Sequence, residues 1–317
     1  MTKTVLITGG FGTLGGRLAK TLANTPDLKV RLASRGHREP PPWHKDAEVF
    51  KVDYENTSSI TQMLHGVTHI VHLASMNDYE CKADPIAAKL VNVEYTQRIV
   101  ERVENKAKFI YLSTIQVYGK DISGTISESS PTNATDSYSL THLQAEEVVK
   151  NEHEAGRFVG VRLRCANGFG APMSADAKIW QIIANDLCRQ AVESQTLTLK
   201  SDGLQYRNFV CMKDICNAII HMINLDTNQI KDGLFNLGGE KSVQVIKMAE
   251  LIVERCEKTL GFRPPINLPA VSVAHSSANF DFTIDKIIST GFKLINDMSA
   301  EIDELLIRCN QWFKYKN

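Results

Sequence analysis

The sequence has no excess of charge of either sign, because its 36 lysines and arginines are balanced by 36 aspartates and glutamates. A chain without net positive charge has no long-range attraction to polyanions, so we expect no nucleic acid and no anionic membrane as partner. It also lacks a run of 18 apolar residues, which argues against a membrane-spanning helix. The first residues, MTKTVLITGG, enter a strand-like pattern without a cleavable apolar leader. We therefore expect a cytoplasmic protein with a small-molecule ligand.

Cysteine is sparse and has no motif spacing. No CxxC pair occurs, and zinc sites or disulfide frameworks need tighter, repeated spacing. His69 and His72 do not form a metal pair either, since residues three apart on a strand point to opposite faces. We expect no metal, and we expect buried thiols in a reducing compartment at most of the seven cysteines, namely Cys81, Cys165, Cys188, Cys211, Cys216, Cys256 and Cys309.

What the chain does have is an alternation of short apolar runs with amphipathic stretches. A composition of 43% hydrophobic and 23% charged residues is that of an ordinary globular protein, and 317 residues suffice for about two domains or one large α/β unit. Buried strands alternating with helices predict a doubly wound parallel sheet, a Rossmann fold, covered by helices on both faces. The predicted strands are 5–7, 30–33, 49–52, 70–74, 109–112 and 158–163, and the predicted helices are 15–22, 86–103 and 140–149.

After about residue 165 the regular alternation of strands and helices ends. The spacing predicts helices over 177–192, 215–223, 243–260 and 299–313, and strands over 196–200 and 234–237. We interpret residues 1–165 as a dinucleotide-binding domain to which segments near 205–238 return. Residues 166–317 are expected to form a smaller mixed α/β lobe that binds the substrate, with the ligand crevice between the two.

A glycine-rich turn lies between the first strand and the first helix. It reads Thr8-Gly-Gly-Phe-Gly-Thr-Leu-Gly15, and its spaced glycines allow a tight turn and a close approach of the backbone to a pyrophosphate. The helix N-terminus then offers free N–H groups and the positive end of its dipole. The strand–turn–helix context predicts a dinucleotide site at Gly9, Phe11, Gly12, Thr13, Leu14 and Gly15.

No carboxylate stands at the end of the second strand, where one would bridge the ribose hydroxyls of NAD and repel a 2′-phosphate. The strand ends in Ser34 and Arg35, which can hydrogen-bond and pair with that phosphate, and Arg38 follows. We therefore expect NADP in preference to NAD.

Together with further segments, these residues resemble the extended short-chain dehydrogenase/reductase family, particularly its nucleotide-sugar epimerase/dehydratase/reductase branch. The similarity extends from Gly9 to the last helix. It implies cofactor contacts from Asp53 and Tyr54 after the third strand, from the HLAS segment containing Leu73, Ala74 and Ser75, and from Asn92 and Ser113. The glycine that usually stands three residues after the asparagine is replaced by Tyr95.

The same resemblance places Thr114 and Tyr138 at the catalytic Ser/Thr and tyrosine positions, with Glu146 trailing the tyrosine. The family has a lysine four residues after the tyrosine, but this chain has His142. Tyrosine is a poor base near neutral pH unless a positive charge stabilises its phenolate. Residue 142 lies one helical turn from Tyr138, so His142 can still donate to the cofactor ribose and can supply charge when it is protonated. This role predicts a decline of activity at alkaline pH.

The second lobe carries two segments similar to substrate-binding segments of the family. In LRCANGFG the residue Asn167, and in GLQYRNFV the residue Arg207, are implied to hold the diphosphate of a nucleotide-diphosphate sugar. Asp214 fits the acidic residue that follows the latter strand. Uracil, guanine and thymine remain open as nucleobases.

The residues that follow Thr114 also restrict the type of reaction that we expect. The 4,6-dehydratases of the branch carry Asp-Glu after the catalytic threonine, where this chain has Ile115 and Gln116, so we do not expect dehydration. The preferred interpretation is an NAD(P)-dependent ketoreductase or dehydrogenase that moves a hydride between nicotinamide and a sugar carbon. The alternatives are an epimerase with tightly bound NAD, a dinucleotide sensor without turnover, and an oxidoreductase for a small non-sugar alcohol. The resemblance further implies a homodimer that pairs the helices 86–103 and 140–149.

Overall fold

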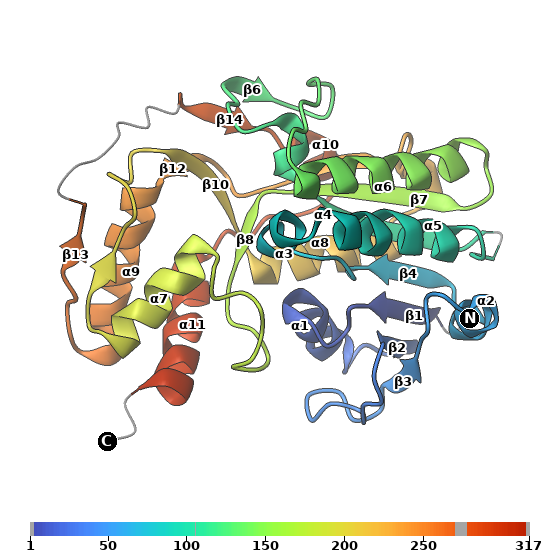
Figure 1. Cartoon of the computed structure of the whole chain (residues 1–317), viewed down its shortest axis with the longest axis horizontal. Helices are drawn as coiled ribbons and strands as arrows, with labels where there is room; N and C mark the ends of the chain where they lie inside the picture. Colours follow the sequence, from blue (N-terminus) through green and yellow to red (C-terminus); the bar gives the residue numbers. More distant parts are fainter. Residues whose placement is uncertain (1–2, 105, 270–277, 315–317) are drawn as a thin grey trace.

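The computed structural model describes residues 3–104, 106–269 and 278–314. Its centre is a seven-stranded parallel sheet in the order β11-β7-β5-β4-β1-β2-β3 (Figure 1). The strands are β1 (Lys3–Thr8), β2 (Leu28–Ser34), β3 (Glu48–Lys51), β4 (His69–His72), β5 (Lys108–Thr114), β7 (Val159–Cys165) and β11 (Leu234–Leu237). The chain runs outward from β1 to β3 and then returns to β4 on the other side of β1. This is the doubly wound order, and it opens a crevice at the carboxyl ends of β1 and β4.

Helices cover both faces of the sheet, because successive residues of each strand point to opposite sides. On β1, Val5 and Ile7 belong to one buried cluster and Leu6 belongs to another. The first cluster is closed by α1 (Thr13–Leu22) and α8 (Met212–Asn224), and the second by α2 (Thr57–Leu64), α5 (Tyr95–Val100) and α6 (Ser137–Glu154). The predicted fold class is therefore confirmed.

The predicted helix 86–103 is not one regular helix. Pro85 begins α4 (Pro85–Lys89), which passes into a π-helical turn, η1 (Leu90–Glu94), and then into α5. Before it lie α3 (Asp78–Ala83) and the capping box of Asn77 and Glu80. A π-helical turn inside a helix often marks a functional position, and this one carries Asn92.

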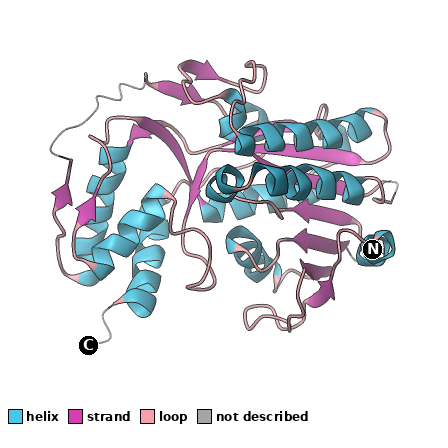
Figure 2. Cartoon of the chain, viewed as in Figure 1, coloured by secondary structure: helices cyan, strands magenta, loops and turns pink. Residues whose placement is uncertain are grey.

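The second half of the chain builds a lobe with its own buried core (Figure 2). A three-stranded sheet, β12-β10-β8, joins β8 (Asn167–Phe169), β10 (Tyr206–Cys211) and β12 (Ser242–Gln244). Phe169 and Phe209 from these strands meet edge to face. The helices α7 (Ile183–Glu193), α9 (Val245–Leu260) and α11 (Met298–Phe313) pack against one another around this core. The segment with α8 and β11 returns to the main sheet.

Short elements complete the described chain. Two small parallel pairs join β9 (Leu197–Thr198) to β13 (Ile266–Asn267) and β6 (Gly124–Ile126) to β14 (Phe280–Phe282). The remaining elements are η2 (Ile115–Tyr118), η3 (Thr227–Gln229) and α10 (Asp285–Ile288). All seven cysteines are buried and free, as expected from their spacing. Within the described ranges, no helix is both long enough and apolar enough to cross a membrane.

Two predicted elements of the lobe are shorter than the sequence suggested. The helix predicted over 177–192 begins only at Ile183, because Trp180 turns away to pack edge to face on Phe313 and donates its indole N–H to Ala175 O. The strand predicted over 196–200 is reduced to Leu197–Thr198. In both places packing against a distant segment overrides the local pattern.

Candidate active site

The glycine-rich turn sits at the carboxyl end of β1 and has the geometry of an anion site. Gly9 has a φ of +68°, and its carbonyl oxygen accepts the N–H of Gly12 at 2.8 Å. A Cβ on Gly15 would stand 2.2 Å from that oxygen, so only glycine fits there. Helix α1 begins with neither a capping side chain nor an acidic residue in its first turn. Its first N–H groups are left to a ligand, and an anion is the ligand that a helix N-terminus favours.

Basic side chains gather around the end of β2. Ser34 is half-buried there and Arg35 is exposed, with its charge acting on the nearby phenols of Tyr54 and Tyr95. The Arg38 guanidinium lies 5.0 Å from the ring centre of Phe11, which belongs to the glycine-rich turn. The loop after β2 therefore brings positive charge to the glycine-rich turn.

The expected adenine-side residues follow β3. Asp53 is exposed and accepts the N–H of Glu55 at 2.9 Å, whereas Tyr54 is buried and stacks on Tyr95 with ring centres 5.2 Å apart. Tyr95 occupies the position at which the resemblance led us to expect glycine. Its phenol donates to Glu55, so the replacement adds a second aromatic ring next to Tyr54.

The end of β4 is joined to β1 and to α5 through buried hydrogen bonds. Thr8 Oγ1 accepts the N–H groups of Leu73 and Ala74 and lies 2.7 Å from His72 Nδ1. His72 Nε2 lies 2.9 Å from the hydroxyl of Thr96. Because burial lowers the pKa of His72 to about 3, this imidazole is neutral and acts as a structural link. The expected cofactor residues Leu73 and Ala74 thus lie directly against the glycine turn, while Ser75 beyond them is exposed.

The side chain of Asn92 connects the segment after β4 to α6 through hydrogen bonds. Its Oδ1 accepts the N–H of Met76 at 2.7 Å, and its Nδ2 donates to Thr141 Oγ1 at 3.1 Å. Thr96 donates to the Asn92 carbonyl, which extends the chain of hydrogen bonds to His72. Asn92 is buried, so its side chain positions the helix that carries Tyr138 and His142.

Thr114, Tyr138 and His142 are brought together by β5 and α6. Thr114 ends β5, and its hydroxyl interacts with the phenol of Tyr138, which tends to lower the pKa of that phenol. The larger effect is burial, which raises the pKa of Tyr138 well above 10. The Tyr138 ring meets His142 edge to face with centres 4.5 Å apart. The residues that the sequence singled out for catalysis therefore share one site.

His142 is a buried neutral imidazole. Its Nδ1 lies 2.7 Å from the hydroxyl of Tyr111, which the sequence analysis did not single out. Burial lowers the pKa of His142 to about 4, so the geometry argues against the protonated role expected from the sequence. Its Nε2 is buried and has no hydrogen-bond partner among the described residues. Such an orphaned atom is what a bound ligand would satisfy.

Behind the site, a buried ion pair fixes α6 to the sheet. Glu146 accepts three hydrogen bonds from Arg164 on β7, the shortest at 2.7 Å, and a further one from the hydroxyl of Ser113. The Arg164 guanidinium also covers the ring of Tyr118 at 4.8 Å. The Ser113 side chain is therefore engaged with Glu146, and only its backbone is left for the expected cofactor contact.

The expected substrate residues lie on adjacent strands of the lobe. Asn167 on β8 donates to Asn208 O at 2.9 Å, one residue from Arg207 on β10. Arg207 is exposed and takes part in none of the ion pairs found between described residues. Asp214, by contrast, is buried and accepts the N–H groups of Ile295 and Asn296, both at 2.9 Å, so it holds a loop.

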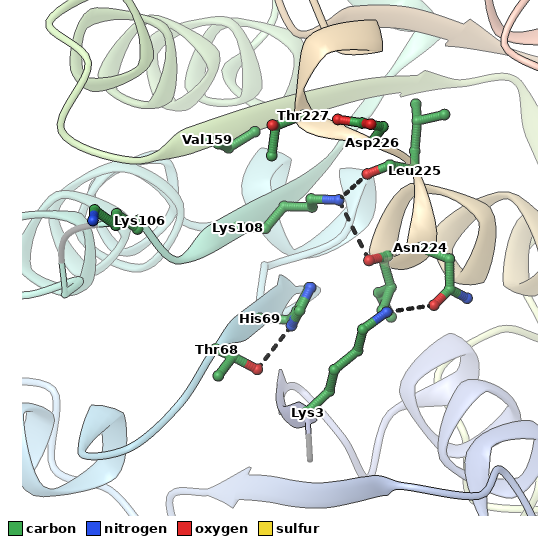
Figure 3. Close-up of a pocket in the computed structure, with 11 residues that line it drawn as sticks. Lys3, Thr68, His69, Lys106, Lys108, Val159, Asn224, Leu225, Asp226 and Thr227 are labelled. Atoms are coloured by element: carbon green, nitrogen blue, oxygen red, sulfur yellow. Dashed lines mark hydrogen bonds between the residues drawn. The ribbon is translucent and has the colours of Figure 1, made fainter. Parts of the chain in front are cut away.

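A cavity of about 370 Å³ lies at the other end of the sheet (Figure 3). It is lined by Lys3, His69 and Lys108, the first residues of β1, β4 and β5, so it faces away from the glycine turn. The Lys108 ammonium donates to Leu225 O at 2.7 Å, just after α8 (Figure 3), and to Met222 O at 2.8 Å in the last turn of that helix. Lys108 is thus a helix cap, and the cavity is a consequence of packing.

Comparison with known proteins finds a matching family model, related sequences and similar folds. A family model described as the NAD dependent epimerase/dehydratase family matches residues 5–238. The dTDP-D-glucose 4,6-dehydratase of Mus musculus is 23% identical over 81% of this chain and 74% of that protein. The dTDP-6-deoxy-L-talose 4-dehydrogenase (NAD(P)(+)) of Kitasatospora kifunensis is 27% identical over 79% of this chain and 78% of that protein. The crystal structure of UDP-glucuronic acid 4-epimerase from Bacillus cereus in complex with NAD has a TM-score of 0.80, with 21% identity over 98% of this chain and 100% of that chain. This last likeness concerns the fold.

Proposed function

The chain belongs to the NAD-dependent epimerase/dehydratase family, and we propose that it transfers a hydride between a nicotinamide dinucleotide and a sugar carbon of a nucleotide-diphosphate sugar. The observation that carries this proposal is the meeting of Thr114 and Tyr138 at the carboxyl end of β5, on the side of the sheet where the uncapped N-terminus of α1 opens. The family membership rests on the match over residues 5–238.

The residues present fit a dinucleotide. The N–H groups at the start of α1 suit the pyrophosphate, and the close approach of Gly9 to the backbone of Leu73 and Ala74 keeps that surface free of side chains. The unpartnered Nε2 of His142 suits a ribose hydroxyl. When bound, the dinucleotide supplies or takes up the hydride.

The chain's own part in the chemistry is to hold the sugar oxygen and to move its proton. Tyr138 Oη is the acid or base at that oxygen, and the Thr114 hydroxyl orients it. Ile115 and Gln116 follow in η2, and neither can act as the acid or base that elimination of water requires. For this reason we do not transfer the dehydration named for the mouse relative. The dehydrogenase activity named for the Kitasatospora relative is closer to the proposed reaction.

We expect NADP(H) to be preferred over NAD(H), since Ser34, Arg35 and Arg38 lie at and just after the end of β2, where the sequence predicts the contact with a 2′-phosphate. The test is titration with NADPH and NADH of the Arg35→Ala variant and of the control Lys29→Ala, which removes an exposed charge at the opposite end of β2. Loss of one charge-assisted contact, about 1.5–3 kcal/mol, should weaken NADPH binding roughly 10- to 100-fold and leave NADH unchanged. Equal effects of both variants would contradict the preference.

The diphosphate is expected at Arg207, with Asn167 beside it. A cavity of about 160 Å³ lies next to β9 and is lined by Thr198, Leu199 and Gln205. We expect the nucleobase of the substrate to bind there, beside β9. Arg207→Gln should raise KM for a nucleotide-diphosphate sugar at least tenfold and leave dinucleotide affinity unchanged. A KM that does not move would favour a small non-sugar alcohol as substrate.

The Tyr138→Phe variant distinguishes an enzyme from a dinucleotide sensor without turnover. In an enzyme this variant loses turnover while binding the dinucleotide normally, and the exposed Tyr79→Phe on α3 is the matched control. Activity that survives in Tyr138→Phe would overturn the proposal.

An epimerase is the second candidate, because the Bacillus cereus neighbour is named as one. Denaturing the purified chain and identifying the released nucleotide by mass decides between them. Stoichiometric NAD would favour the epimerase, whereas an empty protein that binds NADPH favours the reductase or dehydrogenase.

A homodimer through α4 and α6 remains part of the proposal. Ile86 on α4 and Leu140 on α6 are exposed, at 85% and 41% of their surfaces, and Tyr79 on α3 is exposed at 67%. Large apolar side chains gathered on neighbouring helices are typical of a contact surface. We also propose the cytoplasm as the compartment, since seven free, buried thiols suit reducing conditions.

A further inference from the structure

A largely buried arginine of the first helix reaches across to the lobe. Arg17 lies on α1, four residues after Thr13, where the helix begins and where we place the pyrophosphate. Its guanidinium donates to Ala171 O at 3.0 Å, in the loop after β8 that lies between α1 and α11 (Figure 1). It also forms ion pairs with two carboxylates of α11, Glu301 at 3.2 Å and Glu304 at 3.1 Å. One side chain of the dinucleotide-binding half is therefore held by three groups of the lobe.

The Glu301 carboxylate in turn lies at the ends of two strands. Its Oε2 accepts the N–H of Lys213 at 3.2 Å, two residues after β10 ends at Cys211. Its Oε1 faces Gly170, the residue after β8, where φ is +148° and a Cβ would collide with that oxygen. Only 3% of the Glu301 side chain is exposed, so the carboxylate is enclosed between Arg17 and the two strand ends.

Those two strands carry the residues that we expect to hold the substrate diphosphate. Asn167 is the first residue of β8, and Arg207 is the second residue of β10. The strands are paired, and the Asn167 side chain donates to Asn208 O at 2.9 Å. Because β8 is only three residues long, a shift of its end at Gly170 displaces Asn167 as well. Contacts therefore connect the expected pyrophosphate site with the expected diphosphate site.

We propose that the Arg17–Glu301 pair couples the two ligand sites, so that a dinucleotide bound at α1 raises the affinity of the lobe for the nucleoside diphosphate part of the substrate. The inference rests on the proposed function and adds communication between its two sites. The first ligand fixes α1 against the ends of β8 and β10, and the second ligand then has less of the chain to order. Coupling of binding free energies is reciprocal, so the nucleoside diphosphate raises dinucleotide affinity by the same factor.

Arg17 is a positioning residue, because it acts through Ala171 and Glu301. The planar guanidinium suits this task, since its N–H groups bond a backbone carbonyl and carboxylates at the same time, whereas lysine presents a point charge. Glu304 is 40% exposed, and an exposed ion pair contributes little in water. We therefore assign the coupling to the buried partner, Glu301, and expect none from Glu304.

The experiment measures the coupling in the full chain without turnover. The affinity for NADPH, or for NADH if it binds more tightly, is measured by calorimetry with and without a saturating nucleoside diphosphate. UDP, dTDP and GDP are each used, because the nucleobase is open, and all three lack the sugar that would react. The coupling factor is the ratio of the two dissociation constants. In the wild type we expect a factor of at least about 5 with the tightest nucleoside diphosphate, and the same factor when the titration is reversed.

In the Arg17→Met variant the factor should fall below about 2, since the two sites are then independent. This variant leaves a buried carboxylate without its partner, which costs stability. The double variant Arg17→Met/Glu301→Gln is therefore made as well, because it removes both charges and keeps an acceptor for the Lys213 N–H. Circular dichroism and thermal unfolding identify the variants that fold. Glu304→Gln is the matched control and should keep the wild-type factor.

A wild-type factor below about 2, or a wild-type factor retained in a folded variant that lacks the pair, would overturn the inference. Variants that bind each ligand more weakly but keep the factor would overturn it too, because that is what a purely structural role of Arg17 predicts. Failure of the proposed function is distinguishable. In that case the wild type, given each ligand alone, would not bind dinucleotide or would bind none of the three nucleoside diphosphates.

Discussion

Replacement of Gly15 by alanine tests the geometry of the phosphate-binding turn directly. The new Cβ would stand 2.2 Å from Gly9 O and 2.8 Å from Gly10 Cα, both backbone atoms. Carbon–oxygen contacts normally begin near 3.3 Å, so the turn and the helix start must separate by about 1 Å. Overpacking of this kind costs about 1–3 kcal/mol, of which roughly 1 kcal/mol is recovered because alanine is the better helix former.

The effect on binding should exceed the effect on stability. A shift of about 1 Å removes two or more backbone hydrogen bonds to the pyrophosphate at about 1.5–3 kcal/mol each, which weakens binding on the order of 100-fold or more. Dinucleotide affinity is measured by nucleotide fluorescence titration, and stability by urea unfolding. The neighbouring Gly16→Ala is the matched control, because the nearest atoms to its Cβ belong to side chains, namely the flexible Met173 at 3.0 Å and Trp43 at an ordinary 3.7 Å.

We expect Gly16→Ala to bind dinucleotide within about threefold of the wild type and to be no less stable, since its helix gains propensity. A Gly15→Ala variant that binds dinucleotide as tightly as the wild type would refute the assignment of this turn as the pyrophosphate site. Equal loss of affinity in Gly15→Ala and Gly16→Ala would point instead to a general effect of side chains on α1.

Glu146→Gln should destabilise the fold by about 3–5 kcal/mol in urea unfolding, because it leaves Arg164 buried without its partner. The exposed Glu147→Gln should change stability by no more than about 0.5 kcal/mol, and equal losses would speak against a buried pair. Acid should weaken the fold through His142, whose folded pKa of about 4 lies below the unfolded value of 6.5. The unfolded chain binds more protons between these values, so stability falls as pH drops through this window, by up to about 3 kcal/mol from this group. His142→Gln should flatten that slope between pH 7 and 4.5, and an unchanged slope would show that the imidazole is not buried neutral. Ile86→Glu should convert a dimer to a monomer in light scattering without loss of secondary structure, and a wild type that is already monomeric would remove the proposed interface.

Much of the fold was predictable because most strands and helices follow from the hydrophobic pattern of residues that are close in the sequence. Continuous apolar runs marked the strands of the parallel sheet, and β11 matched its predicted range of 234–237 residue for residue. The glycine turn was recognisable because its backbone allows no side chain at Gly15, a requirement that stands in the sequence itself. One helix prediction was wrong because a distant partner intervened: Trp180 packs on Phe313, and α7 begins only at Ile183. Another was wrong because the predicted helix 86–103 is interrupted by a π-helical turn at Leu90–Glu94.

The chemical state of the site was less accessible. The sequence brought Thr114, Tyr138 and His142 into one hypothesis, but nothing near residue 142 in the chain signals that Tyr111, 31 residues earlier, is bonded to its ring. In the same way, Asp214 looked like a site residue until its carboxylate was found holding the backbone of Ile295 and Asn296.

By itself, the sequence determined the order of strands and helices, the phosphate-binding turn and the identity of the groups at the site, because each depends on residues that are close in the chain. Only the tertiary structure decided the charge on those groups. Whether His142 is an imidazolium or a neutral ring depends on how much water reaches it, and the segments that exclude the water come from β5 and from α6 itself. Desolvation is a property of packing in three dimensions, so the burial of the His142 imidazole became visible only in the folded chain.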